Sequence, residues 1–217
     1  MAAEDLLTYT EARQVVREVG ASSTTNGVLL TAAITGVSKA LAAKCGPIIQ
    51  TTVTDERHDG GHSTIWLREW PVTAVTSVTE YDGSTGTALA FETNGNLSTV
   101  GYYPDPYSQS SAPYSGRIHR RNTYADDTFP AGRGNVVVSY TAGRFETTGA
   151  VTEDFKAAAR MTLENWWSQY RNGVRNMDEY EMPASSFPRY DVPRAALHLL
   201  GDEVHGNRDD RPDVLVG

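Results

Sequence analysis

The sequence predicts an α+β protein, in which a small helical bundle carries an inserted antiparallel β-region and an extended C-terminal tail. Apolar residues recur at helical spacing in the first 44 residues and again over residues 152–171. Between residues 48 and 141 the pattern changes to alternation, with β-branched residues and glycine-containing turns. We therefore expect one core over residues 1–171 and a separate partner-binding tail over residues 172–217.

Two helices are expected at the start of the chain. Thr8 and Glu11 have the spacing of a capping box, in which each side chain satisfies a backbone N–H at the helix start. This predicts a first helix over residues 8–19. A second helix is predicted over residues 26–44, which is rich in alanine and is followed by Gly46 and Pro47. Its apolar stripe consists of Leu30, Ile34, Val37 and Leu41.

The β-region contains short runs of alternating or β-branched residues separated by turns. The predicted strands lie at residues 48–55, 63–69, 75–81, 87–91, 116–119 and 135–140. Residues 101–113 are rich in Tyr, Pro, Ser and Gln, and this composition favours an ordered loop or flap over a strand.

A third helix is predicted over residues 152–171. Thr152 can cap it, and two acidic residues in its first turn suit the helix dipole. Trp166, Trp167 and Tyr170 stand at helical spacing, so we expect them to pack in the core. Stacking of these rings on bases or sugars is the alternative.

The chain after Tyr170 has scattered aromatic residues, prolines and no sustained period, followed by a short apolar stretch over residues 192–200 that predicts a helix beginning at Pro193. A segment with such isolated apolar residues orders best against a partner. The expected anchors are Phe187, Tyr190, Val192, Pro193, Leu197, Leu199 and Leu200. The alternative is that this segment folds back on its own subunit.

Charge and cysteine content argue against several classes of protein. The formal net charge is -8, whereas proteins that bind DNA tightly concentrate Lys and Arg. One cysteine, Cys45, allows no intramolecular disulfide. We find no signal-peptide pattern and no run of about 18 apolar residues, and therefore expect neither a leader nor a membrane span.

Motifs for catalysis are weak. Asp55, Glu56, His58, Asp59 and His62 form the densest set of potential metal ligands, but they surround a predicted Asp-Gly-Gly turn and fit a solvated hairpin tip better. The paired carboxylates Asp126-Asp127 and Asp209-Asp210 also lie in polar, loop-like sequence. No nucleophile elbow, P-loop or Rossmann glycine pattern occurs. We expect no catalytic residue, metal or cofactor; a small metal-dependent hydrolase using His58 and His62 is the less favoured alternative.

Four phrases stand in order along the chain: LTYTEA at residues 7–12, WPVTAVTSV at 70–78 followed by Tyr81-Asp82-Gly83, GNVVVSYTAG at 134–143, and VPRAALHLL at 192–200. Together they resemble the head–tail connector adaptors of tailed bacteriophages. The resemblance covers about residues 6–200 and depends on the order of the phrases, since none is specific alone. The long β-region, especially residues 92–127, and the acidic end at 201–217 depart from the family.

The resemblance implies a structural virion protein and not an enzyme. Such adaptors form a ring, typically of twelve subunits, beneath the portal protein, with their C-terminal segments gripping it. Their other face receives a stopper or tail-completion protein, and DNA passes through the lumen without sequence-specific binding. The implied location is the virion neck, after assembly in the host cytoplasm and without a membrane. Another neck or tail-completion protein, a stopper or a tail terminator, is the alternative.

Ring assembly also suggests which residues contact a neighbour or the lumen. A cyclic interface can use long loops that reach the next subunit, and acidic subunits repeated around a ring repel phosphate. The expected contacts are Tyr102, Tyr103, Tyr107, His119, Arg120 and Arg121. For the basic cluster, an exposed strand end without a binding role is the alternative.

Overall fold

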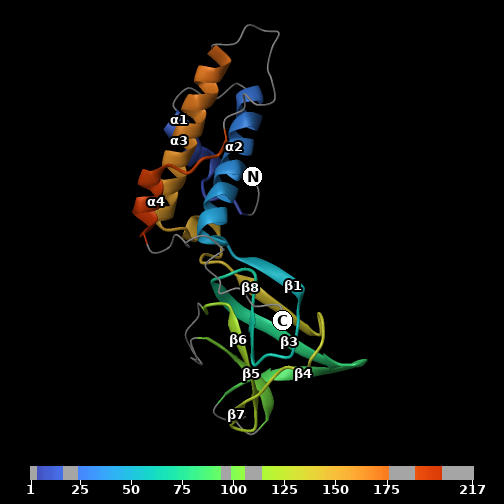
Figure 1. Cartoon of the computed structure of the whole chain (residues 1–217). Coiled ribbons are helices and arrows are strands. Elements are labelled where there is room, and N and C mark those ends of the chain that lie inside the picture. The colour runs from blue at the N-terminus through green and yellow to red at the C-terminus, as the bar shows by residue number, and fades with distance from the viewer. Residues whose placement is uncertain (1–3, 17–23, 94–98, 106–113, 176–188, 202–217) are drawn as a thin grey trace. The chain divides into compact units, whose positions relative to one another are not determined.

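The computed structural model describes residues 4–16, 24–93, 99–105, 114–175 and 189–201 (Figure 1). The chain forms two compact units: Met1–Ile49 with Phe145–Gly217, and Gln50–Arg144. The first unit contains the helices and the second contains the strands, so the predicted α+β class is confirmed. The predicted boundary after residue 171 differs from this division, and the binding role of residues 172–217 stays a prediction.

The helical unit contains α1 (Tyr9–Val16), α2 (Thr24–Cys45), α3 (Glu153–Arg175) and α4 (Arg194–Leu200), with a 3₁₀ turn at Thr148–Ala150. All four helices coincide with predicted ones, and the last three residues of the predicted first helix lie outside the described residues. Its core joins helices far apart in the sequence. The buried residues of α2 and α3 include Leu30, Ile34, Val37, Leu41, Phe155, Leu163, Trp166 and Trp167.

We expected no apolar run long enough to cross a membrane, but part of α2 is long and apolar enough to do so. Gly27–Cys45 spans 19 residues with a mean hydropathy of 1.4, enough to cross a bilayer by these measures alone. In the structure one face of α2 is buried against the other helices of the unit, including Leu30 and Leu41. A core helix meets the same criteria, because a long apolar helix is equally suited to packing in a protein interior.

The capping box at the start of α1 also joins α1 to α3. The Thr8 N–H donates to Glu11 Oε2 at 2.7 Å, and the Glu11 N–H donates to Thr8 Oγ1 at 3.2 Å. Lys156 Nζ on α3 donates to the other carboxylate oxygen at 2.9 Å. Partial burial by itself raises the pKa of Glu11, but the hydrogen bonds from Thr8 and Lys156 outweigh it and lower the pKa from 4.5 to about 2.

The described residues of the β unit form eight strands. They are β1 (Thr51–His58), β2 (Thr64–Trp66), β3 (Val72–Asp82), β4 (Thr85–Phe91), β5 (Val100–Pro104), β6 (Arg117–Asn122), β7 (Ala125–Asp126) and β8 (Val136–Ala142). The sheet order is β1-β8-β3-β4-β5-β6-β2, and β7 pairs with β6. In β8 alternate residues are buried, from Val136 to Ala142, because successive side chains of a strand point to opposite faces.

The prediction of a loop across residues 101–113 is wrong for its first part, because residues 100–104 form β5. This strand pairs antiparallel with β6 and parallel with β4, so the sheet is not purely antiparallel. At Gly101 a Cβ would lie 2.5 Å from the carbonyl oxygen of Ala90, so glycine permits this close pairing. The local composition of residues 100–104 carries no signal for the strands with which they pair. The sequence analysis did not predict β7, because this strand has only two residues. Residues 106–113 lie outside the described residues.

The lowered pKa of Glu11 predicts acid sensitivity of the helical unit. Because the folded pKa is below the unfolded value, this carboxylate stabilises the fold fully above about pH 4.5, and the contribution is lost as pH falls toward 2. We expect Glu11→Gln to lower the unfolding temperature at pH 6 but to have little effect at pH 2.5, as followed by circular dichroism. Equal losses at both pH values would contradict this account.

Candidate functional site

The C-terminal helix α4 presents the predicted anchor residues in two different ways. Ala196 and Leu200 are buried in the core of the helical unit, and Val192 packs against it half-buried. Leu199 is 44% exposed, and the neighbouring Ala195 and His198 are also exposed. Over residues 189–201, therefore, the chain folds back on its own subunit while α4 keeps an outward face. Pro193 caps α4 and Leu197 is half-buried, whereas Phe187 lies outside the described residues.

Tyr190 holds the segment before α4 through aromatic stacking. Its ring lies parallel to Trp166 of α3, with centroids 5.2 Å apart and planes 8° apart. Tyr170 stacks on Trp166 as well, at 5.4 Å and 7°. The three rings confirm the expected packing role of Trp166.

Gly36 of α2 provides the space for the Tyr190 ring. A Cβ at this position would lie 2.2 Å from Cζ of Tyr190, a distance at which one of the two groups must move. A glycine inside a helix costs about 1 kcal/mol relative to alanine. At Gly36 that cost allows Tyr190 to lie against α2.

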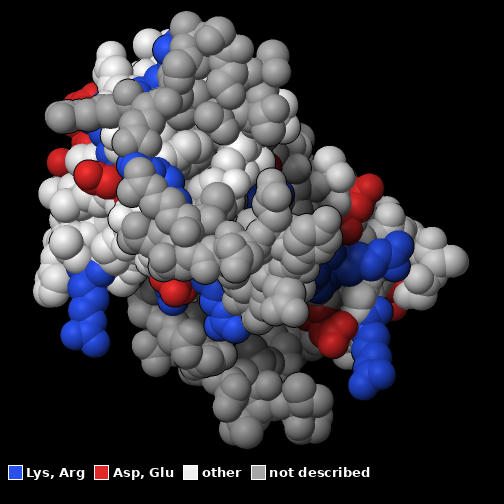
Figure 2. Space-filling model, turned by 90° about the horizontal axis from the view of Figure 1, so that it is seen from above, with Lys and Arg blue, Asp and Glu red and all other residues white. Residues whose placement is uncertain are grey.

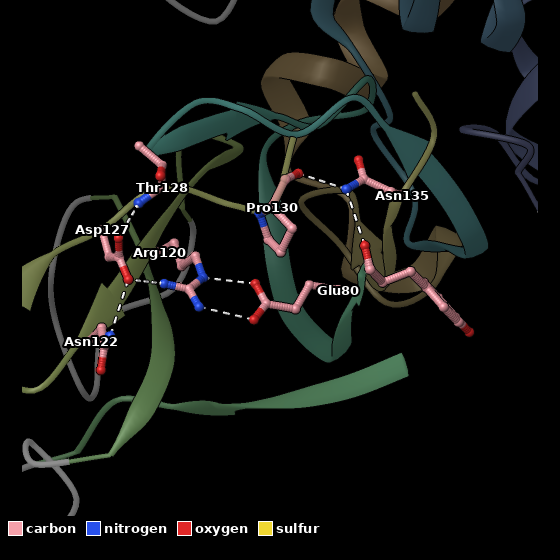
Figure 3. A network of polar contacts seen from close by, with 8 residues as sticks. Glu80, Arg120, Asn122, Asp127, Thr128, Pro130 and Asn135 are labelled. Atoms are coloured by element: carbon pink, nitrogen blue, oxygen red, sulfur yellow. Dashed lines mark hydrogen bonds and ion pairs between the residues drawn. The ribbon is translucent and has the colours of Figure 1, made fainter. Parts of the chain in front are cut away.

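Arg120, predicted as a surface contact, instead belongs to a buried network in the β unit (Figure 3). Its Nε and Nη2 donate to the two carboxylate oxygens of Glu80 at 2.7 and 2.9 Å. Its Nη1 contacts Asp127, which also accepts hydrogen bonds from Asn122 and from the N–H of Thr128. The bidentate contact with Glu80 is the main reason why the pKa of Arg120 is raised.

Tyr102 is also buried, at 3% exposure, with its ring edge-on to Phe91. Burial raises its pKa to about 12. Tyr102 and Arg120 are thus interior residues of this chain rather than surface ones. Register explains the difference: on β6, Ile118 and Arg120 point inward while Arg117, His119 and Arg121 lie on the opposite face.

The outer face of β2, β6 and β5 gathers aromatic and basic side chains. The His119 ring stacks on Tyr103 at 4.7 Å, and the guanidinium of Arg117 lies 4.1 Å from the ring centroid of Trp66. Arg121 lies over Tyr103 at 5.6 Å. This register brings together three of the predicted contacts, and Trp66 and Arg117 are members that sequence reasoning missed. Tyr107 lies outside the described residues.

Carboxylates compensate the cations on this face. Arg117 lies 3.6 Å from Asp105, and Arg121 lies 3.1 Å from Glu92. Burial is the main reason why the pKa of His119 is lowered, which favours its neutral form. A face of Trp, Tyr and Arg with neutralised charge suits a protein interface better than a phosphate backbone.

The candidate metal ligands at the β1–β2 turn do not converge. Glu56 is buried and accepts hydrogen bonds from the Tyr140 hydroxyl at 2.7 Å and the Arg68 N–H at 3.0 Å. His58 Nε2 lies 2.8 Å from the same carboxylate. Burial opposes ionisation of Glu56, but these donors outweigh it and lower its pKa. His62 is exposed, and within the described ranges no three His, Cys, Asp or Glu side chains cluster as metal ligands do.

Charged groups of both signs are mixed on the described part of one face of the molecule. On the face shown in Figure 2, the Lys and Arg side chains lie among Asp and Glu side chains, without one continuous basic area over the described residues. Such mixing, with the net charge of -8, gives little of the field that attracts nucleic acid.

No family model matches the sequence, and no curated protein matches it. One solved structure with a similar chain is the neck of an empty gene transfer agent particle computed with C6 symmetry, with 17% sequence identity over 92% of both chains and a TM-score of 0.49. Another is the virion of a native gene transfer agent particle, with 21% sequence identity over 82% of this chain and 84% of that chain and a TM-score of 0.42. A third is the neck of the native particle computed with C12 symmetry (19%, 89% of this chain and 97% of that chain, 0.38). TM-scores below 0.5 establish neither a shared fold nor a shared role.

The Tyr190 stack can be tested at Gly36. We expect Gly36→Ala to displace the Tyr190 ring from Trp166 and to reduce the near-ultraviolet circular dichroism of the stacked rings, and we expect the same reduction for Tyr190→Ala. The unfolding temperature should change little, because alanine adds about 1 kcal/mol of helix propensity that offsets the lost contact. A Gly36→Ala spectrum identical to that of the wild type would show that the ring does not occupy this position.

The buried network predicts an asymmetry between two arginines on β6. Arg120→Met leaves the Glu80 carboxylate buried without its partner, and we expect it to cost about 3–5 kcal/mol in the free energy of unfolding by urea. Arg117→Ala, at an exposed ion pair, is the matched control and should cost about 1 kcal/mol or less. Adding Glu80→Leu to Arg120→Met should recover part of the loss. Similar costs for Arg120→Met and Arg117→Ala would refute the role of burial.

Proposed function

We propose that this chain is a structural subunit of the neck of a tailed-phage-type particle, an adaptor that forms a ring between the portal and the stopper or tail proteins. The observation that carries the proposal is the ordered set of four sequence phrases together with the elements on which they fall. LTYTEA contains the capping box that begins α1, and VPRAALHLL forms α4. The two remaining phrases form β3 and β8.

The pairing of the two strand phrases supports reading them as one motif. Val78 pairs with Val138 and Val75 with Tyr140, in an antiparallel ladder. Residues 70–78 and 134–143 are far apart in the sequence, yet they meet along most of their length. Phrases that pair in space are a stronger signal than four independent matches, because contact constrains both strands together.

The packing of α4 supports its role as a portal-binding element. A helix of seven residues is not stable alone in water, so α4 needs an apolar surface on which to lie. In this chain that surface is the helical unit, contacted through Ala196 and Leu200, while Leu199 faces outward. A portal can bind this exposed side, or it can take over the apolar contacts that α4 makes with its own subunit.

The charge of the chain suits a ring through which DNA passes. Copies carrying a net charge of -8 each give the lumen a negative potential that repels phosphate and keeps DNA from adhering. The stacked face of Trp66, Tyr103 and Arg117 is the proposed contact with a neighbouring subunit, since such residues dominate protein interfaces. Catalysis has no part in this role.

The test is binding of the purified full chain to the portal protein of the same particle. We expect Leu199→Asp to weaken binding at least about tenfold, because it places a charge on the outward apolar side of α4. The matched control is Met161→Asp on α3, which is similarly exposed and should bind like the wild type. Electron microscopy should show rings on the portal for the wild type.

Two results would overturn the proposal. If the wild-type chain binds no portal, the adaptor role is wrong, and binding to a tail-side protein alone would favour a stopper. If a chain ending at Asn172 still binds and assembles unchanged, the anchor role of the tail is wrong. Leu199→Asp is the cleaner variant, because the truncation also removes the buried residues Ala196 and Leu200.

A further inference from the structure

The helical unit has an open apolar groove beside α1 and α2, with a volume of about 630 Å³. Its lining residues are Tyr9, Gly27, Val28, Thr31, Ala32 and Thr35. The Val28 side chain is 73% exposed, the highest value among the large hydrophobic residues that the structure describes. Exposed apolar surface of this kind marks a binding site more often than a random surface does.

The hydroxyl groups of the two threonines in the groove are already satisfied within the chain. Thr31 Oγ1 donates to the carbonyl oxygen of Gly27 at 3.0 Å, and Thr35 Oγ1 donates to the Asp5 carboxylate at 2.8 Å. Their methyl groups therefore contribute to an apolar lining. Such a lining favours an aliphatic ligand over a polar one, since a polar group placed here without a partner loses its hydrogen bonds to water.

The charge of α2 favours an acidic ligand. The helix contains two lysines and no acidic residue. Lys39 is exposed and lies one helical turn beyond Thr35, on the side of the helix that also carries Val28 and Ala32. A ligand in the groove with carboxylates next to its apolar part would meet Lys39 as it leaves the groove.

The chain itself contains a segment with this composition. Residues 202–217 lie outside the described residues; they have five acidic residues and two arginines, a net charge of -3, and end in Val214-Leu215-Val216 before the final glycine. They follow Gly201, which belongs to the same unit as the groove. Fourteen residues span up to roughly 45 Å when extended, whereas α2 from Val28 to Cys45 is about 25 Å long, so the segment can reach the groove.

We infer that Val214-Leu215-Val216 binds in the groove of its own chain, with the preceding carboxylates near Lys39. Attachment through Gly201 gives the segment an effective concentration in the millimolar range, so a weak apolar contact is sufficient for binding. Binding covers Val28 and gives the acidic end a role that the adaptor family does not supply. This inference does not rest on the proposed function, because it concerns one chain and needs no portal.

Disulfide trapping in the full chain tests the inference. Ala32→Cys places a thiol in the groove and Asp213→Cys places one next to the apolar triplet; Cys45 is fully buried and stays in place. The matched control pairs Asp213→Cys with Ala43→Cys, which is exposed on α2 three turns from Ala32. We expect the groove pair to form an intramolecular disulfide at least about tenfold faster than the control pair, as followed on non-reducing gels.

Two further variants of the groove pair separate apolar from charge recognition. Val28→Asp should slow trapping about tenfold, and Lys39→Glu should slow it by a smaller factor that disappears in 1 M salt. Both positions are exposed, so folding should be unaffected, as checked by circular dichroism. Equal rates for Ala32 and Ala43, or disulfides formed only between chains, would overturn the inference.

Discussion

The antiparallel pairing of β3 with β8 is the interaction on which the rest of this structure depends. β8, the last strand in chain order, lies between β1 and β3. Its inward residues Val136, Val138 and Tyr140 form much of the core of that unit. The segments that precede β1 and follow β8 also contact each other. Ile49 forms a bridge with Phe145, and the Phe145 N–H donates to the carbonyl oxygen of Ile48 at 2.9 Å. The β unit is inserted in the chain between α2 and α3. These two helices can share one core only if the two ends of the insertion lie close together.

Buried polar groups give the β unit a specific arrangement in addition to its apolar packing. The Glu80–Arg120 pair and the Glu56–Tyr140 hydrogen bond each connect strands distant in sequence. Asn135 adds a third link, donating to the carbonyl oxygens of Pro130 and Tyr81 (Figure 3). It also accepts a hydrogen bond from the Gly60 N–H. Because an unpaired polar group in a protein interior is costly, these contacts disfavour other strand registers more strongly than they stabilise the observed one.

Residues 189–201 combine attachment to their own helical unit with an exposed apolar side chain. Tyr190 stacks on Trp166 in the space left by Gly36, while α4 buries Leu200 and exposes Leu199. The side chains of α4 that are buried in the core of the helical unit are Ala196 and Leu200. A segment held by apolar contacts can exchange them for similar contacts on another surface.

The sequence by itself determined the class of the fold, the four helices of the described residues, the capping box of α1 and six of the eight described strands, because these depend on spacing along one segment. It also assigned Trp166 to the core, since that follows from one helix face. Only the tertiary structure decided that residues 100–104 form a strand, that Arg120 and Tyr102 are interior while Tyr103 and His119 are not, and that Trp66 joins Arg117 at the surface. These outcomes depend on which strands pair and in which register, and a shift of one residue reverses every side chain. Pairing between distant segments leaves no local pattern, so it could not be predicted from spacing alone.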